Sequence, residues 1–212
     1  MRLVITGVDM ARPPFDLPLR CRCGHVRGVA REVSPSSGFR FLCYCKDCQA
    51  FARFLERADV LDMAGGTDIF QMPPARVKLT AGTQALRCLR FSSKVIRWYT
   101  DCCRTPIGNT AADPRFPVLA LIHCFMDHAA DGRSRDAVLG PPLCRIYEGS
   151  AVGPLPPMAG APPLVRVFVR RASKMLGWWM RGLARPSPFF DVSTNAPCSV
   201  PRVLTRNERA SL

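Results

Sequence analysis

Seven of the eleven cysteines in this chain fall into three tight groups, and cysteine spacing of this kind is typical of metal sites. The groups are Cys21 and Cys23; Cys43, Cys45 and Cys48; and Cys102 and Cys103. Two thiolates one or two residues apart can curl around a single ion, and the glycine after the first group permits a tight turn. Because thiolates suit zinc, we interpret the groups as zinc ligands rather than as fortuitous or redox thiols.

The number of ligands predicts two kinds of site. Seven thiolates make one closed four-cysteine site and one three-cysteine site with an open position for water or substrate. The central group is compact enough to form the three-ligand site by itself. The first group needs a distant partner, and the adjacent pair at 102–103 is the one that remains. We therefore predict two zinc ions, and which of Cys102 and Cys103 binds which ion stays open.

Other side chains are weaker candidates for chemistry. His25 and His123 are candidate proton carriers, although their settings favour an exposed turn residue and a satisfied core histidine. Arg97 and Arg104 are candidates for holding the carboxylate of a substrate thiol. The four isolated cysteines are interpreted as small buried hydrophobic residues. They are Cys88, Cys124, Cys144 and Cys198.

Residues 1–152 contain the elements that must position these groups. Short apolar runs at close spacing predict an antiparallel, mainly β core. The predicted strands are Val26–Val33, Phe39–Cys43, Asp68–Met72, Val77–Thr80, Leu86–Phe91, Ile96–Thr100, Val118–Phe125 and Cys144–Tyr147. A short helix is expected to begin near Asp47, because Phe51, Phe54 and Leu55 then share one face.

Residues 153–163 are rich in proline, glycine and alanine and predict a linker. Residues 164–212 form a basic tail, in which Leu164–Arg185 has the period of an amphipathic helix. We expect Phe168, Met175 and Trp179 to dock on the β core and the arginines to face solvent, with membrane-surface or nucleic-acid binding as alternatives. Thr205 and Glu208 predict a capping box for a short last helix.

Length and composition fit one domain of ordinary size with an appendage. The chain has 212 residues, of which 48% are apolar and 22% charged, and this excludes a wholly disordered protein. Its net charge of +14 favours anionic partners without choosing among them. No segment has the roughly 20 apolar residues of a membrane span, and the opening MRLVITGVDMARPP lacks the features of a secretory signal. The expected compartment is the reducing cytoplasm, where thiols stay free for metal.

The order of the three cysteine groups resembles the glutathione-dependent formaldehyde-activating enzyme family, which includes centromere protein V. The likeness covers roughly Leu17 to Met126, and GGTDIFQ at 65–71 lies where the family has a hairpin. The tail, with RPSPFFD at 185–191 and PRVLTRNER at 201–209, is similar to a bacterial branch of that family. Tyr44 stands where the family usually has histidine, and Thr100 and Arg104 replace a cysteine and a glycine of its last motif.

This resemblance implies a zinc-bound β fold akin to methionine sulfoxide reductase B, with the amphipathic helix added at the C-terminus. It implies a structural zinc at Cys21, Cys23 and Cys103, and a catalytic zinc at the central group, where glutathione thiol meets formaldehyde. The implied activity is that of a carbon–sulfur lyase, and the implied partner is a small-molecule thiol or thiol adduct. The alternative is a non-catalytic, zinc-stabilised binding module whose basic helix contacts an anionic surface or, less favoured, nucleic acid.

Overall fold

A computed structural model describes residues 14–130, 132–158, 160–205, 207–208 and 212. Within these residues the chain forms eleven strands in two sheets and few helices, one of them C-terminal. The prediction of a mainly β protein with a C-terminal helix is therefore confirmed. Residues 1–13, on which the expectation about a signal sequence falls, lie outside the described part of the chain.

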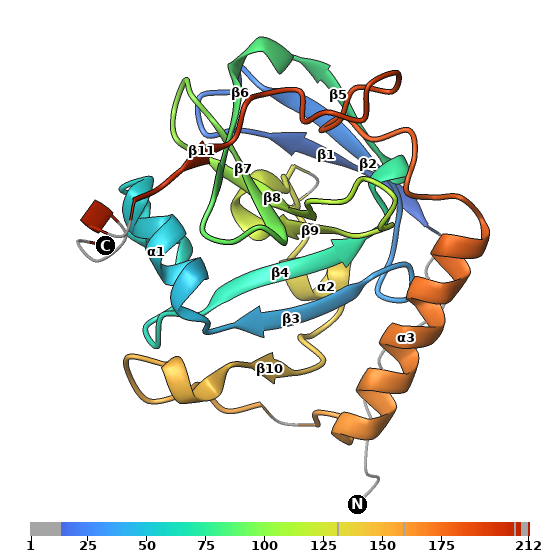
Figure 1. Cartoon of the computed structure of the whole chain (residues 1–212). Helices are drawn as coiled ribbons and strands as arrows, with labels where there is room; N and C mark the ends of the chain where they lie inside the picture. Colours follow the sequence, from blue (N-terminus) through green and yellow to red (C-terminus); the bar gives the residue numbers. More distant parts are fainter. Residues whose placement is uncertain (1–13, 131, 159, 206, 209–211) are drawn as a thin grey trace, which may run out of the picture.

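The two sheets differ in size and share a core (Figure 1). The smaller sheet has the order β1 (Phe15–Arg20), β2 (Arg27–Val33), β5 (Val77–Ala81). The larger sheet has the order β10 (Arg145–Ile146), β3 (Phe39–Cys43), β4 (Thr67–Met72), β9 (Leu119–Ile122), β8 (Pro106–Ala111), β7 (Val95–Thr100), β6 (Leu86–Arg90), β11 (Arg202–Val203). The named strand pairs are antiparallel except the short pairs β10–β3 and β11–β6, which are parallel.

Three strands escape the sequence prediction, and each has a physical reason. β1 contains Pro18, which lacks a backbone N–H and is tolerated because β1 is an edge strand. β8 begins with Pro106 and contains Gly108, and both residue types are depleted in strands, so its sequence lacks a strand pattern. Glycine is needed at 108 because a side chain would place its Cβ 2.6 Å from the Ala120 carbonyl oxygen of β9. β11 has only two residues, too few for any period to be recognised.

Hydrophobic side chains fill both faces of the larger sheet. Between the two sheets lies a cluster that includes the fully buried Phe70, Trp98 and Phe125. The opposite face of the larger sheet carries a second cluster, to which α1 (Lys46–Phe54) contributes Cys48 and Phe51. Helix α1 begins one residue before the expected start. A further short helix, α2 (Arg135–Leu139), follows β9.

Helix α3 (Leu164–Met180) buries other side chains than those predicted. Val167 and Trp178 are its buried residues, whereas Phe168 and Trp179 are 57% and 65% exposed, so the expected docking of the Phe168–Trp179 row is wrong. The orientation of the helix is set by acceptor oxygens on the surface beneath it. Oxygen atoms of Pro35, Ser36 and Gln71 accept hydrogen bonds there from α3 cations, and apolar side chains could not satisfy them.

The residues after α3 return to the β core. Phe189 is fully buried, with its ring centroid 5.0 Å from that of Trp98, and β11 adds itself to the sheet edge at β6. Thr205 and Glu208 exchange the hydrogen bonds of the predicted capping box. None of the helices in the described ranges has the length and apolarity needed to cross a bilayer.

Candidate metal centres

The first and last cysteine groups come together to form a four-cysteine cluster. Cys21 Sγ lies 3.5 Å from Cys23 Sγ and 3.8 Å from Cys102 Sγ. Cys102 Sγ lies 3.4 Å from Cys23 Sγ and 3.8 Å from Cys103 Sγ. All four sulfur atoms lie within 4.8 Å of one another. Both members of the adjacent pair thus belong to the same cluster.

The loop between β1 and β2 folds tightly to present Cys21 and Cys23. The Gly24 amide donates to the Cys21 carbonyl at 2.8 Å, and Gly24 has a φ of +75°, which a side chain would disfavour. The Val26 amide donates to Cys21 Sγ at 3.2 Å. Such N–H···S bonds stabilise a thiolate, so the local backbone prepares a ligand for a cation.

The turn between β7 and β8 supplies the other two sulfur atoms. Arg104 adopts a φ of +53° in this turn, a left-handed conformation that glycine adopts most easily. Thr105 is fully buried, and its hydroxyl accepts from the Arg22 amide at 3.0 Å and from Arg57 Nη1 at 3.2 Å. Thr105 thereby joins the two cysteine-bearing loops, a role that cysteine spacing alone did not indicate.

Hydroxyl groups also act on Cys103. Burial raises its pKa, but contacts with the Thr100 and Thr105 hydroxyls, at 3.4 and 3.1 Å, and hydrogen bonds with Cys23 act in the opposite direction, and together they lower the pKa of Cys103 to about 5. The Thr100 hydroxyl therefore supports a candidate ligand sulfur.

The central group forms a separate three-cysteine cluster at the junction of β3 and α1. Cys43 is the last residue of β3, Cys45 is the N-cap of α1 and Cys48 lies in the first helical turn. Cys43 Sγ and Cys48 Sγ are 3.6 Å apart, and the three sulfur atoms lie within 4.8 Å of one another. The Cys48 amide donates to Cys45 Sγ at 3.4 Å, so the free N–H groups of the helix start face a thiol.

Arg97 of β7 places a buried positive charge beside this three-cysteine cluster. Its side chain is 6% exposed, with Nη1 3.7 Å from Cys48 Sγ and Nη2 3.5 Å from the Asp47 carboxylate. The guanidinium carbon lies 5.3 Å from the ring centroid of Phe91. Hydrogen bonds from the neighbouring thiols lower the pKa of Cys45, and the charge of Arg97 acts in the same direction. The hydrogen bonds among the thiols raise the pKa of Cys43, and the pKa of Cys48 is also raised, so the surroundings favour a single thiolate at Cys45.

Tyr44 stabilises the loop rather than adding a ligand. Its buried side chain donates a hydrogen bond to the Asp62 carboxylate at 2.9 Å. The side-chain Nε2 of Gln49 donates at 2.8 Å both to the Tyr44 backbone carbonyl and to the Ser150 backbone carbonyl. Tyr44 thus helps to fix the segment that carries Cys43 and Cys45.

The donor sets of both clusters fit a tetrahedral metal. With metal–sulfur bonds of about 2.3 Å, the sulfur atoms of a tetrahedral site lie about 3.8 Å apart. The individual sulfur–sulfur distances of 3.4–3.8 Å agree with this spacing. Both clusters could therefore hold a metal ion, and the central one offers one ligand fewer than a closed site.

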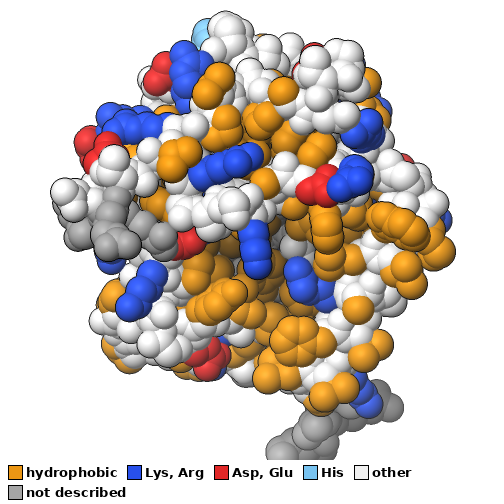
Figure 2. Space-filling view, in the orientation of Figure 1, with side chains coloured by type: hydrophobic (Ala, Val, Ile, Leu, Met, Phe, Trp, Pro, Cys, Tyr) orange, Lys and Arg blue, Asp and Glu red, His pale blue; other side chains and the backbone are white. Residues whose placement is uncertain are grey.

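The three-cysteine cluster lies in an open recess of about 570 Å³ that is lined by residues of both α1 and α3. Figure 2 shows the hollow near the middle of this face, with hydrophobic side chains around it and basic side chains at its rim. Lys46, Lys94 and Arg171 are the basic residues that line it together with Arg97. Arg171 was not among the predicted site residues, because α3 was expected to turn its cations to solvent.

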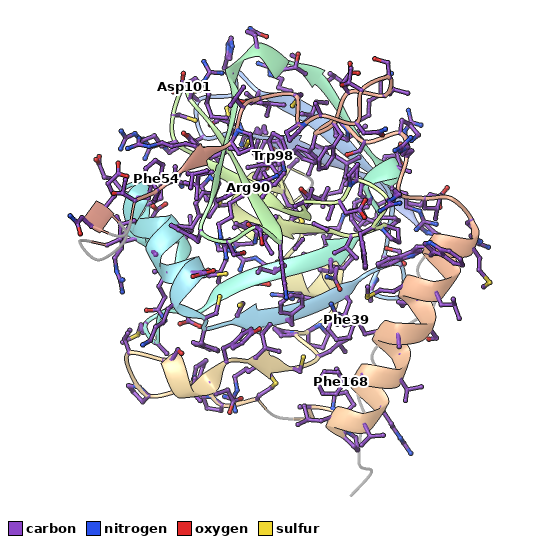
Figure 3. All side chains as sticks on the ribbon, viewed as in Figure 1. Phe39, Phe54, Arg90, Trp98, Asp101 and Phe168 are labelled. Atoms are coloured by element: carbon purple, nitrogen blue, oxygen red, sulfur yellow. The ribbon has the colours of Figure 1, made fainter. Side chains whose placement is uncertain are left out.

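A smaller apolar recess of about 470 Å³ adjoins this one beside β10. It is lined by Phe39, at the start of β3, and by Phe168 of α3, which are both labelled in Figure 3. Arg171 lines both recesses. Helix α3 therefore forms one wall of the space around the three-cysteine cluster.

The other candidate residues lie away from this recess. His25 is exposed, as expected, and contacts Gln84. His123 is partly buried, and burial lowers its pKa to about 4. Its Nδ1 atom has no hydrogen-bond partner among the described residues, so the prediction of a core histidine with its hydrogen bonds satisfied is wrong. Arg104 pairs with Glu56 at 2.8 Å on the surface.

Two of the four isolated cysteines match their interpretation as buried residues. Cys88 and Cys144 are buried, whereas Cys124 is intermediate and Cys198 is exposed, so the interpretation of Cys198 is wrong. The Cys198 amide donates to the Phe189 carbonyl, and that bond holds the segment on the surface of the fold.

Residues 15–198 match a protein family described as a family of unknown function (DUF6151). The chain belongs to this family. The match spans both cysteine clusters, α3 and the buried Phe189. A comparison with curated proteins found no match. The DUF6151 region thus includes every element that contributes to the two candidate metal centres.

Proposed function

We propose that both cysteine clusters bind zinc, a closed structural ion at the four-cysteine cluster and an ion with an open position at the three-cysteine cluster. The all-thiolate donor sets support zinc, and the sulfur spacing supports tetrahedral geometry. We further propose a fold of the methionine-sulfoxide-reductase-B type for the β core, on the order of its cysteine motifs.

We propose that the three-cysteine site catalyses a carbon–sulfur lyase-like reaction on a thiol–aldehyde adduct of the glutathione type. In the synthetic direction a carbon–sulfur bond forms between thiol and aldehyde, and the thiol proton ends on the new hydroxyl oxygen. The reverse direction breaks that bond and returns thiol and aldehyde. The observation that carries the proposal is the incomplete cysteine set at the wall of an open recess.

Zinc with three thiolate ligands would bind the substrate thiolate or polarise the aldehyde oxygen. The side chains of the chain itself account for binding and orientation. Arg97 offsets the negative charge of the three sulfur atoms, and its burial keeps that charge at the cluster. Lys46, Lys94 and Arg171 line the recess and attract a thiol that carries a carboxylate.

The recess also favours a substrate with an apolar part next to the reacting thiol. Phe41, Ile69 and Val118 line it beside the cysteines, and Tyr147 stands at its rim, 65% exposed. These walls offer apolar contacts to the part of the adduct next to its sulfur atom. Among the described lining residues there is no histidine, so the proposal assigns no proton carrier to His25 or His123.

The test combines a metal measurement with a direct exchange assay. Protein purified under reducing conditions is expected to contain about two zinc ions per chain. Magnetisation exchange between ¹³C-formaldehyde and its adducts with glutathione, cysteine and an uncharged alkanethiol measures the catalysed rate. We expect acceleration with the carboxylate-bearing thiols, loss of acceleration in Cys48→Ser, and full acceleration in Cys144→Ser, which removes a buried cysteine outside the clusters.

Two outcomes would contradict the proposal. Fewer than one zinc ion per chain would remove its basis. Two zinc ions with no acceleration for any thiol, and no displacement of the weaker ion by thiol probes, would instead support the non-catalytic zinc-stabilised binding module.

A further inference from the structure

Helix α3 turns a continuous apolar face toward solvent. Seven large hydrophobic side chains of this helix are between 55% and 74% exposed. They are Leu164, Val165, Phe168, Val169, Leu176, Trp179 and Met180. Removing such side chains from water is favourable, so an exposed face of this size indicates a binding partner.

The outward direction of this face is fixed by polar contacts on the opposite side of the helix. Arg171 Nε donates to Gln71 Oε1 at 3.0 Å, and Arg170 Nη2 donates to the Pro35 carbonyl at 3.3 Å. Lys174 donates to the Ser36 carbonyl, and Trp178 is buried beside these cations. Rotation of the apolar row toward the core would break these bonds, so the described fold does not cover the row by itself.

A groove continues the apolar face onto the neighbouring loop. It has a volume of about 850 Å³ and lies between α3 and residues 113–117. Phe116 lines it and is 54% exposed. The acidic residue in its lining, Asp113, is paired with Arg115 at 2.8 Å. The surface is therefore apolar with its one lining carboxylate neutralised.

The positive charge around this face indicates that its partner is anionic. No aspartate or glutamate occurs from residue 149 to residue 190, whereas six cations occur between 164 and 185. Arg166, Arg181 and Arg185 are the exposed ones, placed toward the two ends of the helix. An exposed apolar row with cations at its ends matches a bilayer surface that combines acyl chains with anionic headgroups.

We propose that α3 binds in the plane of an anionic lipid bilayer, with its apolar row in the headgroup–acyl boundary and Arg166 and Arg181 on anionic headgroups. A second copy of the chain is a poorer fit, because it would bring this region of uncompensated positive charge against itself. Nucleic acid is also a poorer fit, because the exposed centre of the helix is apolar and three of the cations are bound to the protein.

The experiment measures binding of the full chain to phosphatidylcholine vesicles with and without phosphatidylglycerol, by flotation. We expect binding that is at least tenfold tighter when phosphatidylglycerol is present. The double variant Phe168→Ser/Leu176→Ser should reduce binding at least tenfold. The matched control Val200→Ser/Val203→Ser removes two exposed apolar side chains outside the face, 90% and 72% exposed, and should bind as the parent does.

Charge variants test the second half of the proposal. Arg166→Gln/Arg181→Gln should weaken binding to phosphatidylglycerol vesicles roughly 10–30-fold, while binding to phosphatidylcholine changes little. Absence of vesicle binding, or binding that the Phe168/Leu176 variant retains, would overturn the proposal. A dimer in lipid-free buffer that the same variant dissociates would overturn it in favour of a second copy, and binding to a DNA duplex without vesicle binding would overturn it in favour of nucleic acid.

Discussion

The two cysteine clusters use the same side chain to solve different structural problems. In the four-cysteine cluster, Cys21 meets Cys102 across 81 positions of sequence and joins the β1–β2 loop to the β7–β8 turn. In the three-cysteine cluster, Cys43 and Cys48 are five positions apart, at the junction of one strand and one helix. A metal ion at the first cluster would therefore tie the two sheets together, whereas an ion at the second cluster would act on a segment that hydrogen bonds already hold.

The two clusters also differ in how far their sulfur atoms are exposed to solvent. Cys23 and Cys102 are exposed, whereas Cys43 and Cys48 are buried beside Arg97. A closed metal site needs no protection from water, since all its positions are filled by protein. A site with an open position gains from a shaped recess and a fixed countercharge. The comparison therefore predicts that damage to the first cluster affects folding and damage to the second affects chemistry.

The largest effect is expected from Cys21→Ser. The free energy of zinc binding in small structural sites is about 10–16 kcal/mol, which is comparable to the total stability of a domain. The variant should lose its cooperative thermal unfolding transition and both metal ions, as measured by circular dichroism and elemental analysis. Cys198→Ser, which changes an exposed cysteine outside the clusters, is the control and should unfold as the parent does.

A Cys21→Ser protein that folds and keeps its metal would contradict the role of the four-cysteine cluster. The hydrogen bond that the Arg22 amide donates to the Thr105 hydroxyl would then be sufficient to join the two loops.

A smaller effect on folding is expected from Cys48→Ser. Gln49 and Tyr44 hold the β3–α1 junction independently of the thiol, so the variant should remain folded with a modest loss of stability. It should contain one zinc ion less than the parent and show no thiol-adduct activity. Thermal unfolding and metal analysis on the same sample measure both effects. If this variant unfolds as completely as Cys21→Ser, the two clusters do not have the separate roles assigned to them.

The smallest and most specific effect is expected from Arg97→Gln. Loss of the buried charge beside Cys48 should weaken metal retention at the three-cysteine cluster about tenfold, because a hydrogen bond to a charged group is worth about 1.5–3 kcal/mol. Arg97→Lys should restore part of this loss. Competition with a chromophoric chelator measures metal retention at each cluster.

Arg104→Gln is the matched control at the other cluster. This arginine pairs with Glu56 on the surface, where ion pairs contribute little, so metal retention should not change. Equal effects of Arg97→Gln and Arg104→Gln would mean that overall positive charge, rather than the buried contact with Cys48, stabilises the metal.

The sequence predicted features that depend on local pattern. Cys43, Cys45 and Cys48 form a cluster because they flank one strand end and one helix start, and both elements have a recognisable period. The partnership of Cys21 with Cys102 followed from ligand counting, which is a chemical constraint rather than a structural one. Most strands of the larger sheet were predicted for the same local reason.

Features that depend on the tertiary surroundings could not be predicted in this way. The period of α3 identified a helix, but its orientation depends on backbone carbonyls of Pro35 and Ser36, which no sequence pattern marks as acceptors. The rule that apolar rows face inward failed because acceptor oxygens beneath the helix bind its cations. For the same reason Arg171 was absent from the predicted site, although it lines the recess of the three-cysteine cluster.

The burial of Phe189 against Trp98 has a consequence for synthesis of the chain on the ribosome. All strands except β11 precede Phe189 in sequence, so a nascent chain can pair nearly the whole sheet while one side of Trp98 is still uncovered. Phe189 and Phe190 complete that side only after they have left the exit tunnel, later than every strand except β11. We therefore expect translation intermediates that stop before this point to expose an aromatic surface and to depend on chaperones.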